Sequence, residues 1–133
     1  MSAFSRIAFF TAGLAAVASA SIQVPGGSDP TGPAVYQPGL ASVVPAGIPF
    51  SITWSTDKSS DCGETVDLVL LHGASAATMQ AISYIATKAD NNGTYAWTPS
   101  KDLAPSESDT GYGIELICSK NNAYQCQYPL SLP

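Results

Sequence analysis

Short runs of alternating apolar and polar residues recur along this chain of 133 residues. Phe50, Ile52 and Trp54 alternate with a serine and a threonine, which predicts a strand with one buried face. The run 65–73, TVDLVLLHG, is apolar on both faces, as is typical of a strand in the middle of a sheet. Two further runs near the C-terminus are separated from the others by turn residues.

The segment 74–90, ASAATMQAISYIATKAD, fits two interpretations. Its alanines and Met79 permit a helix, whereas Ile82, Tyr84 and Ala86 recur at every second position, as in a strand. We favour the strand. The chain then has six to seven short strands and no convincing long helix. This pattern predicts an all-β sandwich of antiparallel strands, of the immunoglobulin or fibronectin type.

The N-terminus has the composition of a secretory signal peptide. Arg6 precedes an apolar run, 7–18, and Ala18-Ser19-Ala20 is the small-x-small pattern that signal peptidase cleaves. The apolar run is too short to cross a hydrocarbon core of ~30 Å. We therefore expect residues 1–20 to be removed and the protein to be secreted.

The remaining chain divides into a proline- and glycine-rich lead-in, 21–39, and one domain, 40–133. Loss of Arg6 changes the net charge from -5 to -6, and only 11% of the residues are charged. A weakly acidic chain without basic runs has no electrostatic surface for nucleic acid or anionic membranes. A second apolar segment of membrane length is also missing from the sequence. We expect a neutral, hydroxyl-rich extracellular surface.

Catalytic and metal-binding patterns are weak. His72 is the single histidine, it ends a predicted strand, and no nucleophile-elbow motif accompanies it. Acidic residues gather in two polar loops, with Asp61 and Glu64 in one and Asp102, Glu107 and Asp109 in the other. Carboxylates in such loops are normally solvated, whereas a glycosidase needs a facing pair with one desolvated acid. We expect no catalytic residue, no metal and no cofactor.

The chain has three cysteines, Cys62, Cys118 and Cys126, an odd number for an oxidising compartment. We favour a disulfide between Cys62 and Cys118, since each flanks a predicted central strand at the same end of the sandwich. Closing this separation of 56 residues stabilises the fold by roughly 4 kcal/mol in the chain-entropy model. Pairing of Cys118 with Cys126 is the alternative, and it closes a smaller loop.

The segment 91–103, NNGTYAWTPSKDL, combines a turn with a glycosylation sequon, Asn92-Gly93-Thr94. An Asn-Gly turn exposes its backbone, so we expect a glycan on Asn92; the alternative is that these residues serve the tight turn alone. Tyr95 and Trp97 then share one face of a strand. They are candidate glycan contacts, but the same spacing is more typical of core packing, which we favour for Trp97.

Taken together, four segments resemble a known family: PAGIPFSITWS, TVDLVLLHG, NNGTYAWTPSKDL and YGIELI. They are similar, in order and spacing, to the N-terminal immunoglobulin-like domain of the fungal cell-wall glucan-synthesis family of Kre/KNH type. The resemblance covers about 40–125. It implies a secreted or wall-associated fungal protein, linked with β-1,6-glucan assembly and without catalytic residues.

The C-terminus departs from that family's pattern. Cys126-Gln127-Tyr128-Pro129 follows the AYQ region, where relatives continue with a different last strand. Proline is also a poor residue for a central strand because it has no N–H to donate. Residues 126–133 are therefore expected to be atypical.

The leading functional hypothesis is a secreted, non-catalytic module of the fungal cell wall or extracellular matrix. Its expected partners are cell-wall polysaccharide, specifically β-glucan, or wall proteins. The alternative is a secreted effector-like module that binds a partner protein through an exposed sheet edge. A small wall glycosidase is the third hypothesis.

Overall fold

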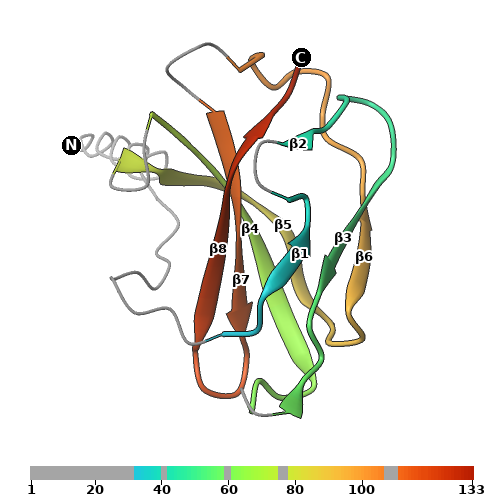
Figure 1. Cartoon of the computed structure of the whole chain (residues 1–133), viewed down its shortest axis with the longest axis vertical. Helices are drawn as coiled ribbons and strands as arrows, with labels where there is room; N and C mark the ends of the chain where they lie inside the picture. Colours follow the sequence, from blue (N-terminus) through green and yellow to red (C-terminus); the bar gives the residue numbers. More distant parts are fainter. Residues whose placement is uncertain (1–31, 40–41, 59–60, 75–77, 107–110) are drawn as a thin grey trace, which may run out of the picture.

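The computed structural model describes residues 32–39, 42–58, 61–74, 78–106 and 111–133 and arranges them in two β-sheets (Figure 1). The strands are β1 (Val35–Gln37), β2 (Ser42–Val43), β3 (Phe50–Trp54), β4 (Thr65–Gly73), β5 (Gln80–Asp90), β6 (Thr94–Trp97), β7 (Gly111–Cys118) and β8 (Tyr124–Ser131). One sheet has the order β1-β3-β6 and the other β2-β8-β7-β4-β5. Within the described ranges there is no α-helix, so the prediction of an all-β sandwich is confirmed. The expected signal peptide, Glu107 and Asp109 lie outside the described residues.

The structure has more strands than the six to seven expected, because β1 was not recognised; β2 is the short strand expected before the turn at Pro45-Ala46-Gly47. β1 lies inside the segment expected to be a lead-in and pairs antiparallel with β3. β2 has only two residues and runs parallel to β8, with Ser42 opposite Leu130. The three residues of β1, among prolines and glycines, are too few to show a period of two, so the pairing partner, rather than local pattern, determines this strand.

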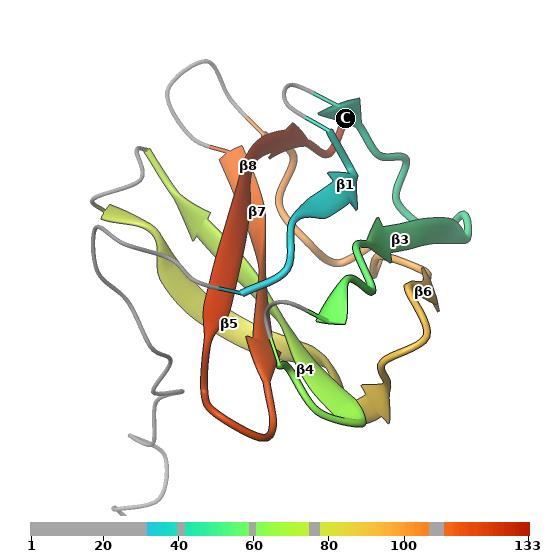
Figure 2. The same cartoon turned by 60° about the horizontal axis from the view of Figure 1, so that its bottom comes forward.

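β4 lies between β5 and β7, and its two faces are apolar because each contributes to an apolar cluster. Leu68 and Leu70 point into the main core, where they meet Ile52 and Trp54 of the other sheet. Val69 belongs instead to a second, smaller apolar cluster on the opposite face of the sheet. Full burial of each such side chain stabilises the fold by about 1.5–3 kcal/mol. Figure 2 shows β3 and β6 in one layer and β8, β7 and β4 in the other.

The ambiguous segment before residue 90 forms β5, so the strand interpretation is confirmed. β5 is an edge strand of the larger sheet, and its pairing with β4 is interrupted by three irregularities. Irregularities of this kind increase the local twist of a strand. Ile82 and Tyr84 are large exposed side chains on this strand.

The atypical C-terminal segment is part of the larger sheet as β8, between β2 and β7. Tyr112 of β7 pairs with Leu130 of β8, and Ile114 pairs with Gln127. An interval of two residues in β7 therefore lies opposite an interval of three residues in β8, which is a bulge in β8. Pro129 falls within this irregular step. A bulge is one of the few places in a sheet where the missing N–H of proline is tolerated, which reconciles Pro129 with an internal strand.

Candidate functional site

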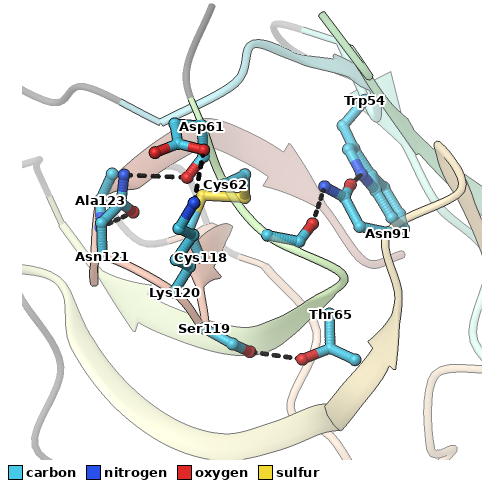
Figure 3. Close-up of a disulfide and its surroundings, with 11 residues drawn as sticks. Trp54, Asp61, Cys62, Thr65, Asn91, Cys118, Ser119, Lys120, Asn121 and Ala123 are labelled. Carbon is cyan, nitrogen blue, oxygen red and sulfur yellow. Dashed lines mark hydrogen bonds and ion pairs between the residues drawn. A yellow bond between two sulfur atoms is a disulfide. The ribbon is translucent and has the colours of Figure 1, made fainter. Parts of the chain in front are cut away.

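A disulfide closes one end of the sandwich (Figure 3). Cys62 lies just before β4 and Cys118 ends β7, and their Cα atoms are 4.8 Å apart. Both residues are buried, and they belong to the main apolar cluster. The predicted pairing is therefore present, and Cys126 carries the free thiol.

Asn91 connects this end of the sandwich to the core tryptophan of β3. The Nε1–H of Trp54 donates a hydrogen bond to Asn91 Oδ1 at 2.7 Å, and Asn91 Nδ2 donates to the Gly63 carbonyl at 2.9 Å (Figure 3). A buried tryptophan needs an acceptor for its N–H. The sequence predicts only a turn at Asn91. The buried indole of Trp54 was the available signal that a polar partner must lie nearby.

The loop before β4 is held against the β7–β8 turn. Asp61 adopts a positive φ of 49° and forms an ion pair of 2.9 Å with Lys120. Asn121 Nδ2 donates to the Asp61 carbonyl. Because both charged side chains are largely exposed, the ion pair contributes at most about 1 kcal/mol. Asp61 thus fixes the loop that carries Cys62.

Beside this loop is an open hollow of about 420 Å³. Its lining is mixed, with two carboxylates, one ammonium group and backbone, from Thr56, Asp57, Lys58, Asp61, Cys62, Gly63 and Asn91. Asp57 and Asp61 are exposed, so neither is the desolvated acid that glycoside hydrolysis requires. His72 is at the other end of β4, where its ring packs on Tyr112 with centroids 4.5 Å apart. The structure does not bring histidine and these acids together.

Tyr95 and Trp97 are on the inner face of β6. They pair with Ile52 and Phe50 of β3, and both pack in or against the main apolar cluster. Trp97 is only 8% exposed, whereas Tyr95 is half-buried at the sheet edge. The two rings do not form an exposed stacking platform. Of the two candidate glycan contacts, only Tyr95 presents part of its ring to solvent.

Asn92 is exposed in the turn between β5 and β6. Its Oδ1 accepts a hydrogen bond from the Thr94 N–H at 3.2 Å, which closes an Asx turn. Gly93 has a φ of 92°, and this left-handed conformation explains the glycine. The sequon is therefore presented on a tight, solvated turn beside the Asn91 bridge.

The outer face of the three-stranded sheet is uncharged. Five residues form what we call the hydroxyl face: Tyr36, Ser51, Thr53, Thr94 and Ala96. Thr53 pairs with Thr94, and Ser51 with Ala96, so they form two adjacent rows across β3 and β6. Tyr36 extends from the neighbouring β1 and is 58% exposed. Sequence reasoning missed this face, because the pairing that assembles it involves the unrecognised β1.

One family model matches the chain: the Kre9/KNH-like N-terminal Ig-like domain, over residues 37–130. This match covers more than half of the chain. The protein belongs to the Kre9/KNH-like family. Neither the curated proteins nor the solved structures contain a match to this chain. The Kre9/KNH family is linked to cell-wall glucan synthesis, and it is not a known catalytic family.

The Kre9/KNH-like domain also contains a buried polar pair that the sequence analysis missed. Glu115 of β7 is 3% exposed, lies opposite Cys126 of β8, and accepts a hydrogen bond from its Sγ at 3.2 Å. The other oxygen, Oε2, has no hydrogen-bond partner among the described residues. Burial raises the pKa of Glu115, although the bond from Cys126 opposes the shift. Burial, followed by the charge of Glu115 and their hydrogen bond, raises the pKa of Cys126 to about 12.

In the described part of the Kre9/KNH-like domain, no group of three or more His, Cys, Asp or Glu side chains lies close enough to hold a metal ion. None of the described elements is a helix of the length and apolar character needed to cross a bilayer.

Proposed function

We propose that this protein is a secreted, non-catalytic module of the fungal cell wall that contacts β-glucan through its hydroxyl face. The observation that supports the contact is the chemistry of this face, within a family linked to cell-wall glucan synthesis. Its polar residues are serine and threonine, and its aromatic residue is the exposed Tyr36. The face carries no charge.

Such a surface suits a neutral polysaccharide. Sugar hydroxyls exchange hydrogen bonds with Ser51, Thr53 and Thr94, and no charged side chain has to be desolvated when they do so. The ring of Tyr36 offers an apolar surface with a polar end, on which a sugar ring can stack. Because the face is small, we expect a single contact with the sugar to be weak. Binding to a polymer is stronger overall, because a polysaccharide offers the same site many times along its chain.

The test is co-sedimentation of the protein with insoluble β-1,6-glucan and, separately, with β-1,3-glucan. Tyr36→Ala should reduce the bound fraction at least threefold. Tyr84→Ala is the matched control, because Tyr84 is similarly exposed, at 45%, but lies on the other sheet. Thermal unfolding of both variants verifies that they fold. Equal binding by Tyr36→Ala and the wild type would reject the hydroxyl face as the contact surface.

A second candidate is the recognition of a partner protein through the β5 edge. The observation that favours it is the pair of exposed apolar side chains, Ile82 and Tyr84, on a strand with an unpaired edge. In this case, neither glucan sediments the protein. Tyr84→Ala then weakens capture of the partner, and Tyr36→Ala leaves it unchanged.

A glycosidase activity is the third candidate, and it has a direct test. The protein is incubated with soluble β-1,3- and β-1,6-glucans, and reducing ends are counted. We expect no turnover. Turnover that disappears in Asp57→Asn or Asp61→Asn would replace the non-catalytic proposal with a site in the hollow.

A further inference from the structure

We propose that Asn92 carries an N-linked glycan and that Asn91 beside it never does. The chain has four asparagines, in the pairs 91–92 and 121–122, and only Asn92 begins an N-x-Ser/Thr sequence. The inference depends on secretion, which is part of the proposed function. The structure adds that the two adjacent side-chain amides differ: that of Asn91 is bonded inside the protein, and that of Asn92 is exposed.

Both polar atoms of the Asn91 side chain have partners inside the protein. The oxygen accepts from Trp54 Nε1–H, and the nitrogen donates to the Gly63 carbonyl. A sugar on Asn91 Nδ2 would replace one of its two N–H groups and would have to fit beside these bonds in a partly buried position. The fold therefore needs Asn91 unmodified.

The amide of Asn92 is arranged in the opposite way. Its oxygen is engaged by the Thr94 N–H, its backbone N–H donates to the Asp90 carbonyl at 2.8 Å, and its side chain is exposed. No contact within the described residues uses Asn92 Nδ2. A glycan on this nitrogen costs the fold no hydrogen bond, and the turn holds the threonine of the sequon beside it.

The reaction is a glycosyl transfer from a lipid-diphosphate-linked oligosaccharide, which the secretory pathway supplies. Asn92 Nδ2 attacks C1 of the first sugar, and an N–C1 bond forms as the bond from C1 to the diphosphate oxygen breaks. The lipid diphosphate leaves with the bonding electrons, and Nδ2 loses one proton. Neither oxidation nor reduction takes place.

The glycan would stand at one edge of the hydroxyl face, two residues from Thr94. It would also flank the hollow, which Asn91 helps to line. The proposal therefore predicts that this end of the sandwich is covered by sugar, whereas the row that contains Ser51 and Ala96 is further from it.

The experiment is expression of the full chain in a eukaryotic host that performs N-glycosylation. A second form, in which residues 1–20 are replaced by a proven secretory leader, separates failure of the natural leader from failure of the sequon. The mass of each protein is measured before and after treatment with an amidase that removes N-glycans. Amidase treatment in heavy-oxygen water converts a modified asparagine to a labelled aspartate, which peptide mass spectrometry locates.

We expect a loss of mass after amidase treatment and the label on Asn92 alone. Asn92→Gln and Thr94→Ala should abolish the glycan, whereas Thr94→Ser, which keeps the sequon, should retain it. An unmodified mass in the form with the proven leader overturns the proposal and leaves glucan binding untouched. A label on Asn91, or a glycan that persists in Asn92→Gln, also overturns it.

Discussion

Two cysteine environments in this domain differ in how completely their polar groups are satisfied. At the end of the sandwich, Cys62 and Cys118 are covalently joined, and Asn91 satisfies the tryptophan of the neighbouring core. On the face of the larger sheet away from the main core, Cys126 donates to Glu115, and the other carboxylate oxygen has no partner in the part of the chain that the structure describes. The first region stabilises the fold, whereas the second makes stability depend on pH.

The largest effect is expected from removal of the disulfide. The double variant Cys62→Ala with Cys118→Ala should lower the free energy of unfolding by roughly 4 kcal/mol, because the unfolded chain loses a long closed loop. Urea denaturation measures the change. Cys126→Ala is the control, and it should cost much less. Similar losses in the two proteins would mean that the disulfide stabilises the fold no more than the packing of one thiol does.

The next effect is expected at Asn91. Asn91→Ala leaves the buried N–H of Trp54 and the carbonyl of Gly63 without their partners, which should cost about 2 kcal/mol. Asn92→Gln is a control in the adjacent position; it loses only the exposed Asx-turn bond from the Thr94 N–H and should cost at most about 1 kcal/mol. Both are measured in protein from a host that does not glycosylate. The interpretation fails if the two variants are equally stable.

These two regions also differ in how well the sequence predicts them. The position of each cysteine beside an apolar strand favours the Cys62–Cys118 pairing over Cys118–Cys126, and periodicity together with the spacing of turn residues indicates the all-β fold. The contact between Glu115 and Cys126 depends on the register of β7 against β8, which is shifted by a bulge near Pro129. No local pattern encodes this register, because it is set by the whole sheet.

Whether an aromatic side chain is buried or exposed is likewise hard to predict from the sequence. Tyr95 and Trp97 alternate in the way that an exposed platform would, but pairing with β3 turns both toward the core. Tyr36 lies in a segment whose prolines and glycines concealed β1. Sequence periodicity shows which residues share a face, and only the stacking of the sheets shows whether that face is inside.

A smaller effect is expected from the charge of Glu115. Because burial raises its folded pKa above the ordinary value of 4.5, its contribution to stability is complete below that value. This contribution is lost as the pH rises from about 4.5 through the raised pKa. Glu115→Gln removes this titration. The free energy of unfolding of the wild type should therefore fall relative to that of the variant as the pH increases. Denaturation at several pH values measures it. Parallel stability curves for the two proteins would show that Glu115 does not titrate abnormally.

The smallest effect on stability is expected from changes at Cys126, where reactivity is the informative measurement. A thiol reacts as its thiolate, and a pKa of about 12 instead of 9.0 lowers the thiolate fraction about a thousandfold. Alkylation of the native protein at mildly alkaline pH should therefore be slow, and unfolding should restore the ordinary rate. Glu115→Gln removes the neighbouring charge and should raise the native rate, although burial, the larger cause of the shift, remains. If native and unfolded protein react equally fast, Cys126 is not protected, and the odd cysteine is free to form intermolecular disulfides. Slow alkylation would instead explain how one unpaired thiol persists without cross-linking the protein in the disulfide-forming compartment that the proposed secretion implies.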